Sequence, residues 1–198
     1  MNILLNGGRG KVGTVLGQGL EAGGHTLVDS LDTADAMVDF TRPEAAAANV
    51  RAAVAAGVPS VVGTTGWDLD EFRTAPVTVF YAPNFAIGAV LMMRFAAEAA
   101  RYLEQAEIVE LHHATKVDRP SGTAKLTAER MGGDVPIHSV RLPGLNAHQE
   151  VILGDAGQTL SIRHDAISRE AYTPGVLLAL AKLSSLPPGL TVGLDALL

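Results

Sequence analysis

The chain has 198 residues, of which 47% are hydrophobic and 18% charged, a composition typical of a globular protein with a proper core. Its formal net charge is −6 at pH 7 and it has no run of Lys and Arg, so we expect no nucleic-acid partner, because binding phosphates needs a concentrated basic face. The absence of cysteine excludes a disulfide framework and a thiolate metal site.

Targeting and membrane signals are absent from the sequence pattern. The N-terminal segment MNILLNGGRG has no basic leader followed by a long apolar stretch, so we expect no signal peptide. Apolar runs such as 176–181 are far shorter than the roughly 20 residues of a membrane span. We therefore expect a soluble protein of the cytoplasm that has no membrane partner.

The first half of the chain alternates between strand and helix patterns. Strands are expected at 2–5, 25–31, 36–40, 60–62 and 77–81, and helices at about 11–20, 45–56 and 69–74. Such alternation predicts right-handed crossovers and an α/β fold, with a Rossmann-type doubly wound parallel sheet.

Three glycines follow the first strand at the spacing G-x-x-G-x-x-G, namely Gly7, Gly10 and Gly13. Glycines there let the backbone approach a pyrophosphate and direct the start of the next helix toward it. A plain turn between strand and helix can have the same spacing. Asp32 lies 19 residues after Gly13, where an acidic residue meets the ribose hydroxyls of a dinucleotide, with Asp29 as its competitor.

Two further segments follow strands of the expected sheet. Gly63–Thr65 and Ala82–Phe85 lie at strand ends, the edge at which ligands bind in open α/β sheets. They can line the nicotinamide end of a cofactor or be simple tight turns, and periodicity does not separate the two.

The pattern changes after Ile87. Helices are expected at about 88–105, 124–131 and 171–182, and strands at 107–112 and near 138–141, 150–153 and 159–165. Successive strands without intervening helices predict a second, α+β unit with a mainly antiparallel sheet.

The densest polar cluster of the chain lies at 112–124. His112, His113 and Lys116 follow a strand, and Ser121-Gly-Thr opens the next helix. A helix start offers backbone N–H groups to a carboxylate, Lys116 adds positive charge, and an imidazole can act as a general acid near neutral pH. The cluster therefore suits a small dicarboxylate. A solvated loop with incidental histidines is the bland alternative. We expect no metal, because adjacent strand residues point to opposite faces and no third ligand has suitable spacing.

Several motifs in order resemble the 4-hydroxy-tetrahydrodipicolinate reductases, also called dihydrodipicolinate reductases. They are GGRGKVG at 7–13, VDFTRPEA at 38–45, VVGTTGW at 61–67, YAPNFAIG at 81–88, ELHHATKVDRPSGTA at 110–124, SVRLPG at 139–144 and HDAISREAYTPGVLLA at 164–179. The element HHxxKxDxPSGTA is the most specific of them.

The resemblance implies an NAD(P)H-dependent reduction of 4-hydroxy-tetrahydrodipicolinate, through dihydrodipicolinate, to tetrahydrodipicolinate in lysine and diaminopimelate synthesis. It implies a dinucleotide-binding domain of residues 1–86 plus 173–198. Residues 87–172 would bind the substrate and build a homotetramer. Hydride would reach C4 of the substrate ring, and C3 would be protonated.

The resemblance also assigns roles to residues. His112 would be the proton donor and His113 would contact the substrate, while Lys116 would assist protonation or anchor a carboxylate. Gly122 and Thr123 would bind the other carboxylate through backbone N–H groups. The cofactor would be bound by the following residues: Gly7, Gly8, Arg9, Gly10, Lys11, Val12, Gly13, Asp32, Gly63, Thr64, Thr65, Ala82, Pro83, Asn84 and Phe85.

The chain departs from the family between Asp32 and Ala36, where it is shorter. Thr33 occupies the place of a basic residue that helps bind the 2′-phosphate of NADPH. A carboxylate near that position favours NADH, although Arg9 and Lys11 can compensate, so NADH and NADPH both remain open. Two rivals also remain: a related dehydrogenase of an aspartate-derived substrate, and a nucleotide-sensing protein without catalysis. The presence of His112 and Lys116 disfavours the second.

Overall fold

The computed structural model describes all residues, Met1–Leu198, and divides them into two compact units. The first comprises Met1–Ile87 with Arg169–Leu198, and the second comprises Gly88–Ser168. The chain returns to the first unit after Ser168, four residues before the boundary at 172/173 expected from the sequence. The reason is that Arg169–Tyr172 form a 3₁₀ turn that packs on helices α1 (Gly13–Ala22) and α5 (Thr173–Lys182) of the first unit.

The first unit contains a fully parallel six-stranded sheet with the order β10-β5-β4-β3-β1-β2. Its strands are β1 (Asn2–Asn6), β2 (Thr26–Val28), β3 (Ala36–Asp39), β4 (Ser60–Val62), β5 (Thr78–Tyr81) and β10 (Gly189–Val192). The expected doubly wound sheet is confirmed. The chain leaves β1 toward β2 on one side and returns to β3 on the other side, so the strand order reverses between β1 and β3. Ligands bind at such a switch point, beyond the carboxyl ends of the strands.

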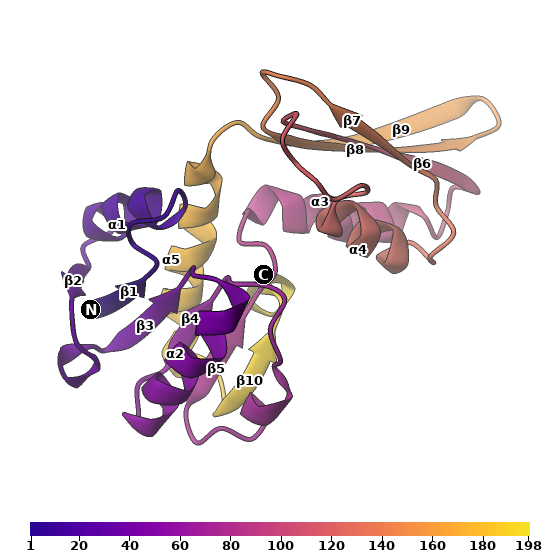
Figure 1. Cartoon of the computed structure of the whole chain (residues 1–198). Helices are drawn as coiled ribbons and strands as arrows, with labels where there is room; N and C mark the ends of the chain where they lie inside the picture. The colour runs from indigo at the N-terminus through magenta and orange to yellow at the C-terminus, as the bar shows by residue number, and fades with distance from the viewer. The chain divides into compact units, whose positions relative to one another are not determined.

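Helices cover both faces of this sheet (Figure 1). Helix α2 (Pro43–Ala55) buries Val50 and Ala53 against Met37, Val62 and Val79 of the strands. Helices α1 and α5 pack against each other, and glycines allow their close approach. A Cβ on Gly19 would lie 2.4 Å from Cγ2 of Thr173, far inside van der Waals contact.

The connection from β2 to β3 is unusually short, because residues 29–35 cross β1 without a helix. Parallel strands are normally joined by a dozen or more residues. Here a single 3₁₀ turn, Leu31–Thr33, suffices because it is fastened to the start of β1. The Asn2 amide donates to Asp35 Oδ2 at 2.6 Å and the Asn2 side chain to the Thr33 carbonyl at 3.1 Å.

The second unit contains a four-stranded sheet with the order β7-β6-β8-β9. Its strands are β6 (Gln105–His112), β7 (Ile137–Arg141), β8 (Ala147–Asp155) and β9 (Gln158–Ala166). The β6–β8 and β8–β9 pairs are antiparallel, as expected. The pair β6–β7 is parallel, because helix α4 (Gly122–Arg130) forms a crossover between them. Helices α3 (Ile87–Ala99) and α4 lie on one face of this sheet and bury Ile108, Val151 and Leu153 (Figure 1).

Two expected elements were wrong, and one strand was not predicted. The helix at 69–74 is only a 3₁₀ turn, Asp70–Phe72, because so short a segment cannot repay helix nucleation. The helix expected to reach Gln105 ends at Ala99, and Gln105 already pairs in β6. The residues after Pro188 form β10, which pairs with β5. No helix combines the length and apolar character that a membrane crossing requires.

Candidate active site

The glycine loop after β1 permits backbone contacts that no side chain would allow. Gly7 has φ +86°, and a Cβ there would lie 2.2 Å from the Phe40 carbonyl oxygen. A Cβ on Gly13 would lie 2.0 Å from the Gly7 oxygen. The ends of β1 and β3 and the start of α1 therefore converge. No side chain caps α1, and although the Thr14 amide donates to the Gly10 carbonyl at 2.9 Å, the N-terminal end of the helix still attracts an anion.

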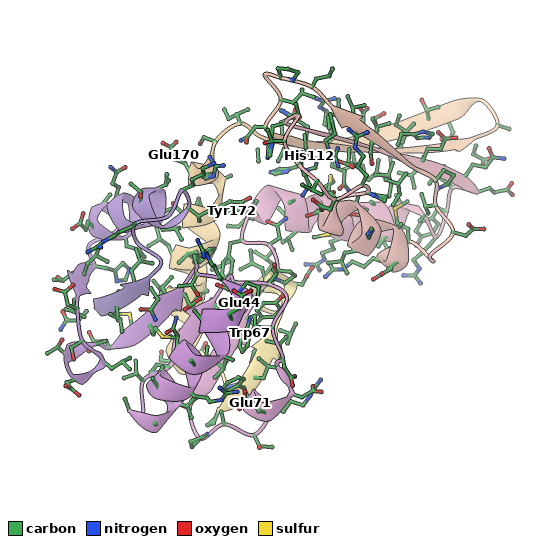
Figure 2. All side chains as sticks on the ribbon, viewed as in Figure 1. Glu44, Trp67, Glu71, His112, Glu170 and Tyr172 are labelled. Atoms are coloured by element: carbon green, nitrogen blue, oxygen red, sulfur yellow. The ribbon has the colours of Figure 1, made fainter.

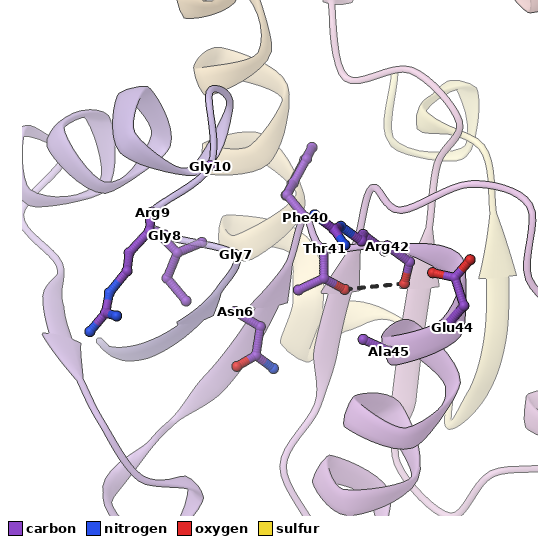
Figure 3. A pocket seen from close by; sticks show the side chains of 11 residues that line it. Asn6, Gly7, Gly8, Arg9, Gly10, Phe40, Thr41, Arg42, Glu44 and Ala45 are labelled. Carbon is purple, nitrogen blue, oxygen red and sulfur yellow. Dashed lines mark hydrogen bonds between the residues drawn. The ribbon is translucent and has the colours of Figure 1, made fainter.

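A cleft of about 1030 Å³ opens at this convergence, beyond the carboxyl ends of β1 and β3 (Figure 3). The glycine loop forms one side and the segment after β3 forms the other. The lining residues are Leu5, Asn6, Gly7, Gly8, Arg9, Gly10, Phe40, Thr41, Arg42, Glu44 and Ala45. Two guanidinium groups, Arg9 and Arg42, outnumber the one carboxylate of the lining, Glu44, and this excess of positive charge suits a phosphate-containing ligand.

A buried carboxylate that sequence reasoning missed fastens the loops after β3 and β4. Asp39 is fully buried and accepts hydrogen bonds from Thr41 Oγ1 at 2.8 Å, Thr64 Oγ1 at 2.6 Å and Asn49 Nδ2 at 2.7 Å. The available signal was an acidic residue at the end of an otherwise apolar strand. The network holds the two loops together at the edge of the sheet where ligands bind.

The two segments expected near the nicotinamide meet at Phe40. A Cβ on Gly63 would lie 2.3 Å from the Phe40 ring, and the Phe85 ring centroid lies 5.4 Å from that of Phe40. The Thr64 carbonyl accepts a hydrogen bond from Trp67 Nε1 at 2.6 Å (Trp67 is labelled in Figure 2). Gly63–Thr65 follow β4 and Ala82–Phe85 follow β5, so both segments lie at the same sheet edge as the glycine loop, although neither lines its cleft.

Asp32 does not line the cleft either. It lies in the 3₁₀ turn after β2, where its backbone N–H and carboxylate both bond to Ser30 Oγ at 3.2 and 3.3 Å. Asp29 directly follows β2 and is also exposed. Lys11 and Val12 precede α1 outside the cleft lining. The structure thus groups Gly7, Gly8, Arg9 and Gly10 but does not bring Asp32 to them.

In the second unit, β6 carries His112 at its end (Figure 2). Alternation along the strand places Ile108, Glu110 and His112 on one face. His112 Nδ1 contacts Glu110 Oε2, and Glu110 is fully buried. Arg141, which pairs with His112 across β6 and β7, donates two hydrogen bonds to the same carboxylate. Neither Glu110 nor Arg141 was among the expected site residues.

The surroundings of His112 shift its acidity in opposing directions. Burial lowers the pKa of His112, the hydrogen bond and charge of Glu110 raise it, and Lys116 and Arg141 lower it, so the net pKa lies below its usual value. Burial alone would raise the pKa of Glu110, but hydrogen bonds from Arg141, Ser139 and His112 hold that pKa below its usual value. At neutral pH Glu110 is therefore a carboxylate, and the His112 imidazole is mainly in its neutral form.

The loop after His112 contains the remaining expected substrate residues. Lys116 Nζ lies 2.7 Å from Asp118 Oδ1, and His113 is exposed, with its Nδ1 2.8 Å from Thr115 Oγ1. Ser121 caps α4 by accepting from the Ala124 amide at 3.2 Å. A Cβ on Gly122 would meet nothing within 4 Å, so the space beside the first turn of α4 is open. No group of three His, Asp or Glu side chains is placed to hold a metal ion.

Sequence comparisons identify the family. Residues 21–85 match the family described as dihydrodipicolinate reductase, N-terminus, and residues 88–198 match dihydrodipicolinate reductase, C-terminus. The 4-hydroxy-tetrahydrodipicolinate reductase of Desulfitobacterium hafniense is 50% identical over 194 residues, which cover 82% of this chain and 72% of the relative. The chain belongs to the dihydrodipicolinate reductase family. It is therefore an oxidoreductase.

Other members of the dihydrodipicolinate reductase family match over the full length. The 4-hydroxy-tetrahydrodipicolinate reductase of Mycolicibacterium vanbaalenii is 43% identical, and the alignment covers 100% of this chain and 99% of the relative. That alignment spans 243 positions, so the relative has segments that this 198-residue chain lacks. The structure of dipicolinate-bound dihydrodipicolinate reductase from Paenisporosarcina sp. TG-14 superposes with a TM-score of 0.86 at 28% identity, covering 100% of this chain and 99% of the other.

The rival dehydrogenases share the fold alone. Aspartate semialdehyde dehydrogenase II from Vibrio cholerae gives a TM-score of 0.58 at 12% identity, over 94% of this chain and 99% of the other. Family membership rather than fold therefore separates this chain from them.

Proposed function

We propose that this chain reduces 4-hydroxy-tetrahydrodipicolinate, through dihydrodipicolinate, to tetrahydrodipicolinate with NADH or NADPH, in lysine and diaminopimelate synthesis. The observation that carries the proposal is the His112 site: an imidazole held by a buried carboxylate beside Lys116 and the open start of α4, in a member of the reductase family.

The first unit fits a nicotinamide dinucleotide. The glycines form a tight loop, because a Cβ at position 7 would collide with the Phe40 backbone and one at position 13 with the Gly7 backbone, and the start of α1, which no side chain caps, suits a pyrophosphate. Gly7–Gly13 would hold the phosphates, with Asp32 or Asp29 toward the ribose and Gly63–Thr65 and Ala82–Phe85 toward the nicotinamide. When bound, the reduced nicotinamide supplies a hydride.

The second unit would bind the dicarboxylate substrate. Backbone N–H groups at Gly122 and Thr123 would hold one carboxylate, and Lys116 with His113 would hold the other. Lys116, which is partly buried, would leave the exposed Asp118 for a substrate carboxylate, so one ion pair would replace another. Fixing both ends of the ring positions its reacting carbons, which is the main contribution a protein makes to a hydride transfer.

His112 would supply the proton. Loss of water from the substrate leaves a ring with a carbon–carbon double bond conjugated to an imine. A hydride added at C4 moves the electron pair of that double bond toward the ring nitrogen, and C3 then takes a proton from His112. The imidazole returns to its protonated form by taking a proton from solvent, so one hydride and one proton are consumed in each turnover.

No basic residue that could bind a 2′-phosphate follows Asp32. The use of NADPH or NADH therefore depends on the residues that line the cleft. Arg9 and Arg42 line the cleft, whereas Asp32 does not. A guanidinium in the cleft can pair with a 2′-phosphate and does not repel a 2′-hydroxyl, which supports use of both NADPH and NADH.

The protein would form a homotetramer and would be located in the cytoplasm. Helices α3 and α4 lie on one face of the second sheet, while the opposite face, which carries the ion pair of Arg163 with Glu150, is left for another subunit (Figure 1). Multi-angle light scattering of the purified protein tests the tetramer, and a monomeric mass at micromolar concentration would contradict it.

A spectrophotometric assay tests the reaction. The chain should oxidise NADH or NADPH only when 4-hydroxy-tetrahydrodipicolinate, generated enzymatically in the cuvette, is present. His112→Gln should reduce turnover by roughly 10²- to 10⁴-fold, the usual contribution of a general acid, with cofactor affinity unchanged. Substrate-independent oxidation, or full activity of the variant, would overturn the proposal.

A further inference from the structure

A buried ion pair lies next to His112 in the second unit. Glu110 is fully buried and the side chain of Arg141 is 1% exposed. The guanidinium donates from Nη1 to Oε2 at 2.8 Å and from Nη2 to Oε1 at 2.7 Å. Buried ion pairs add little net stability compared with apolar side chains of the same volume, so the other contacts of this pair are the informative ones.

The first of these contacts reaches the imidazole. His112 Nδ1 contacts Glu110 Oε2, and a carboxylate can only accept. The proton of the neutral ring therefore belongs on Nδ1, and Nε2 on the far side of the ring is the nitrogen that gains and loses a proton. An oriented imidazole with one fixed tautomer is a more effective acid than a freely rotating one.

The remaining contacts reach the loop that carries the substrate residues. The Ser121 amide donates to Glu110 Oε1 at 3.3 Å, and Arg141 Nη2 donates to the Asp118 carbonyl at 2.7 Å. Residues 113–121 start at His112 and end at the cap of α4. The ion pair therefore holds the acid, the Lys116 loop and the start of α4 against one carboxylate.

We propose that Glu110 is a positioning residue for the reaction proposed above: it orients His112, and with Arg141 it holds the carboxylate-binding start of α4 in place beside that acid. The assignment rests on the proposed function. The charged groups that face His112 are Glu110 on its own strand, Arg141 on β7 and Lys116 in the following loop. Without the Glu110 carboxylate only the two cations remain, and the pKa of His112 falls further.

Two variants separate the two contacts. Glu110→Gln should lower kcat roughly 10- to 100-fold, a share of what a positioned acid contributes, and should move the high-pH decline of kcat/KM to lower pH. Arg141→Lys keeps the positive charge but cannot bridge the carboxylate and the Asp118 carbonyl together, so KM for the substrate should rise more than kcat falls, with the decline in place.

Glu107→Gln is the matched control. Glu107 pairs with His138 at 2.8 Å on the same strand β6, but that Glu–His pair is exposed, so kcat, KM and the pH profile should stay as in the wild type. A pH profile for Glu110→Gln that matches the wild type, with activity lost only in proportion to unfolded protein, would overturn the positioning role.

The tautomer of His112 in the wild-type protein provides a test that does not depend on whether the Glu110 and Arg141 variants fold. Long-range ¹H–¹⁵N spectra of ¹⁵N-histidine-labelled protein, assigned with His112→Gln, should show neutral His112 protonated at Nδ1. Protonation at Nε2 would overturn the inference. This readout does not depend on turnover, so an inactive wild-type protein would contradict the proposed function alone, whereas an active protein with the wrong tautomer would contradict the positioning role alone.

Discussion

Gly13→Ala tests the glycine loop most sharply. The new Cβ would lie 2.0 Å from the Gly7 oxygen and 2.6 Å from its carbonyl carbon, whereas ordinary contacts begin at 3.4 Å. Both neighbours are backbone atoms, so no side-chain rotation relieves the clash and the loop must move by more than about 1 Å. Overpacking of this kind costs about 1–3 kcal/mol, of which alanine recovers at most about 1 kcal/mol through its helix propensity.

A displaced loop should also weaken cofactor binding. One or two hydrogen bonds to the pyrophosphate would be lost, each worth about 1.5–3 kcal/mol because the acceptor is charged, so Kd should rise roughly 10- to 100-fold or more. Trp67, the only tryptophan, lies with Gly13 in the first unit, so urea unfolding followed by its fluorescence measures the stability of that unit. Calorimetric titration with NADH and NADPH measures Kd.

Gly17→Ala is the control for this experiment. Gly17 lies in α1, where a Cβ would make only ordinary contacts of 3.5 and 3.6 Å with Leu27 and Leu5. That variant should be up to about 1 kcal/mol more stable than the wild type and should bind the cofactor normally. If Gly13→Ala matches Gly17→Ala in both stability and Kd, the glycine loop does not hold the cofactor.

Three further predictions concern the substrate loop, the cofactor and the acid. Gly122→Ala should leave the urea midpoint unchanged, because a Cβ there meets nothing within 4 Å. It should lower kcat/KM for the substrate roughly tenfold, because the new methyl group would occupy space needed by the substrate carboxylate. An unchanged kcat/KM would contradict carboxylate binding at this site. Arg9→Ala should lower kcat/KM roughly fivefold with NADPH and little with NADH, as expected for an exposed charge worth about 1 kcal/mol; equal losses with both cofactors would contradict a 2′-phosphate contact. His112 must be protonated to act, so kcat/KM should decline as pH rises through the lowered pKa of His112 in the free enzyme. The decline of kcat should come at higher pH, because the two substrate carboxylates raise the pKa of His112 in the complex. Declines of kcat and kcat/KM at the same pH would refute this reasoning.

Local patterns that repeat along the sequence were sufficient to predict the corresponding parts of the fold. The alternation of apolar strands and helices predicted the parallel sheet, and the glycines 7, 10 and 13 predicted a loop whose close contacts the structure confirms. Strand β10 was missed because its four residues form a strand only by pairing with β5, more than a hundred residues earlier. The parallel β6–β7 pair was missed for a related reason, since it depends on how α4 crosses between them.

The residues that organise the polar cluster were missed although a signal existed. Glu110 alternates with Ile108 and His112 on the inward face of its strand, and a carboxylate on an apolar face requires a partner. Its partner Arg141 lies 31 residues away, so only the pairing of β6 with β7 reveals it. Asp32 illustrates the opposite case, because spacing brought it to attention while the shortened β2–β3 connection places it outside the cleft.

Transfer of deuterium from NADPH that carries deuterium at both C4 positions of its nicotinamide tests the central claim most directly. With 4-hydroxy-tetrahydrodipicolinate as substrate, mass spectrometry and NMR of the product should show one deuterium at C4 of tetrahydrodipicolinate, in amounts equal to the NADPH oxidised. A product without deuterium at C4, or oxidation of NADPH without tetrahydrodipicolinate, would contradict the reaction proposed for this chain.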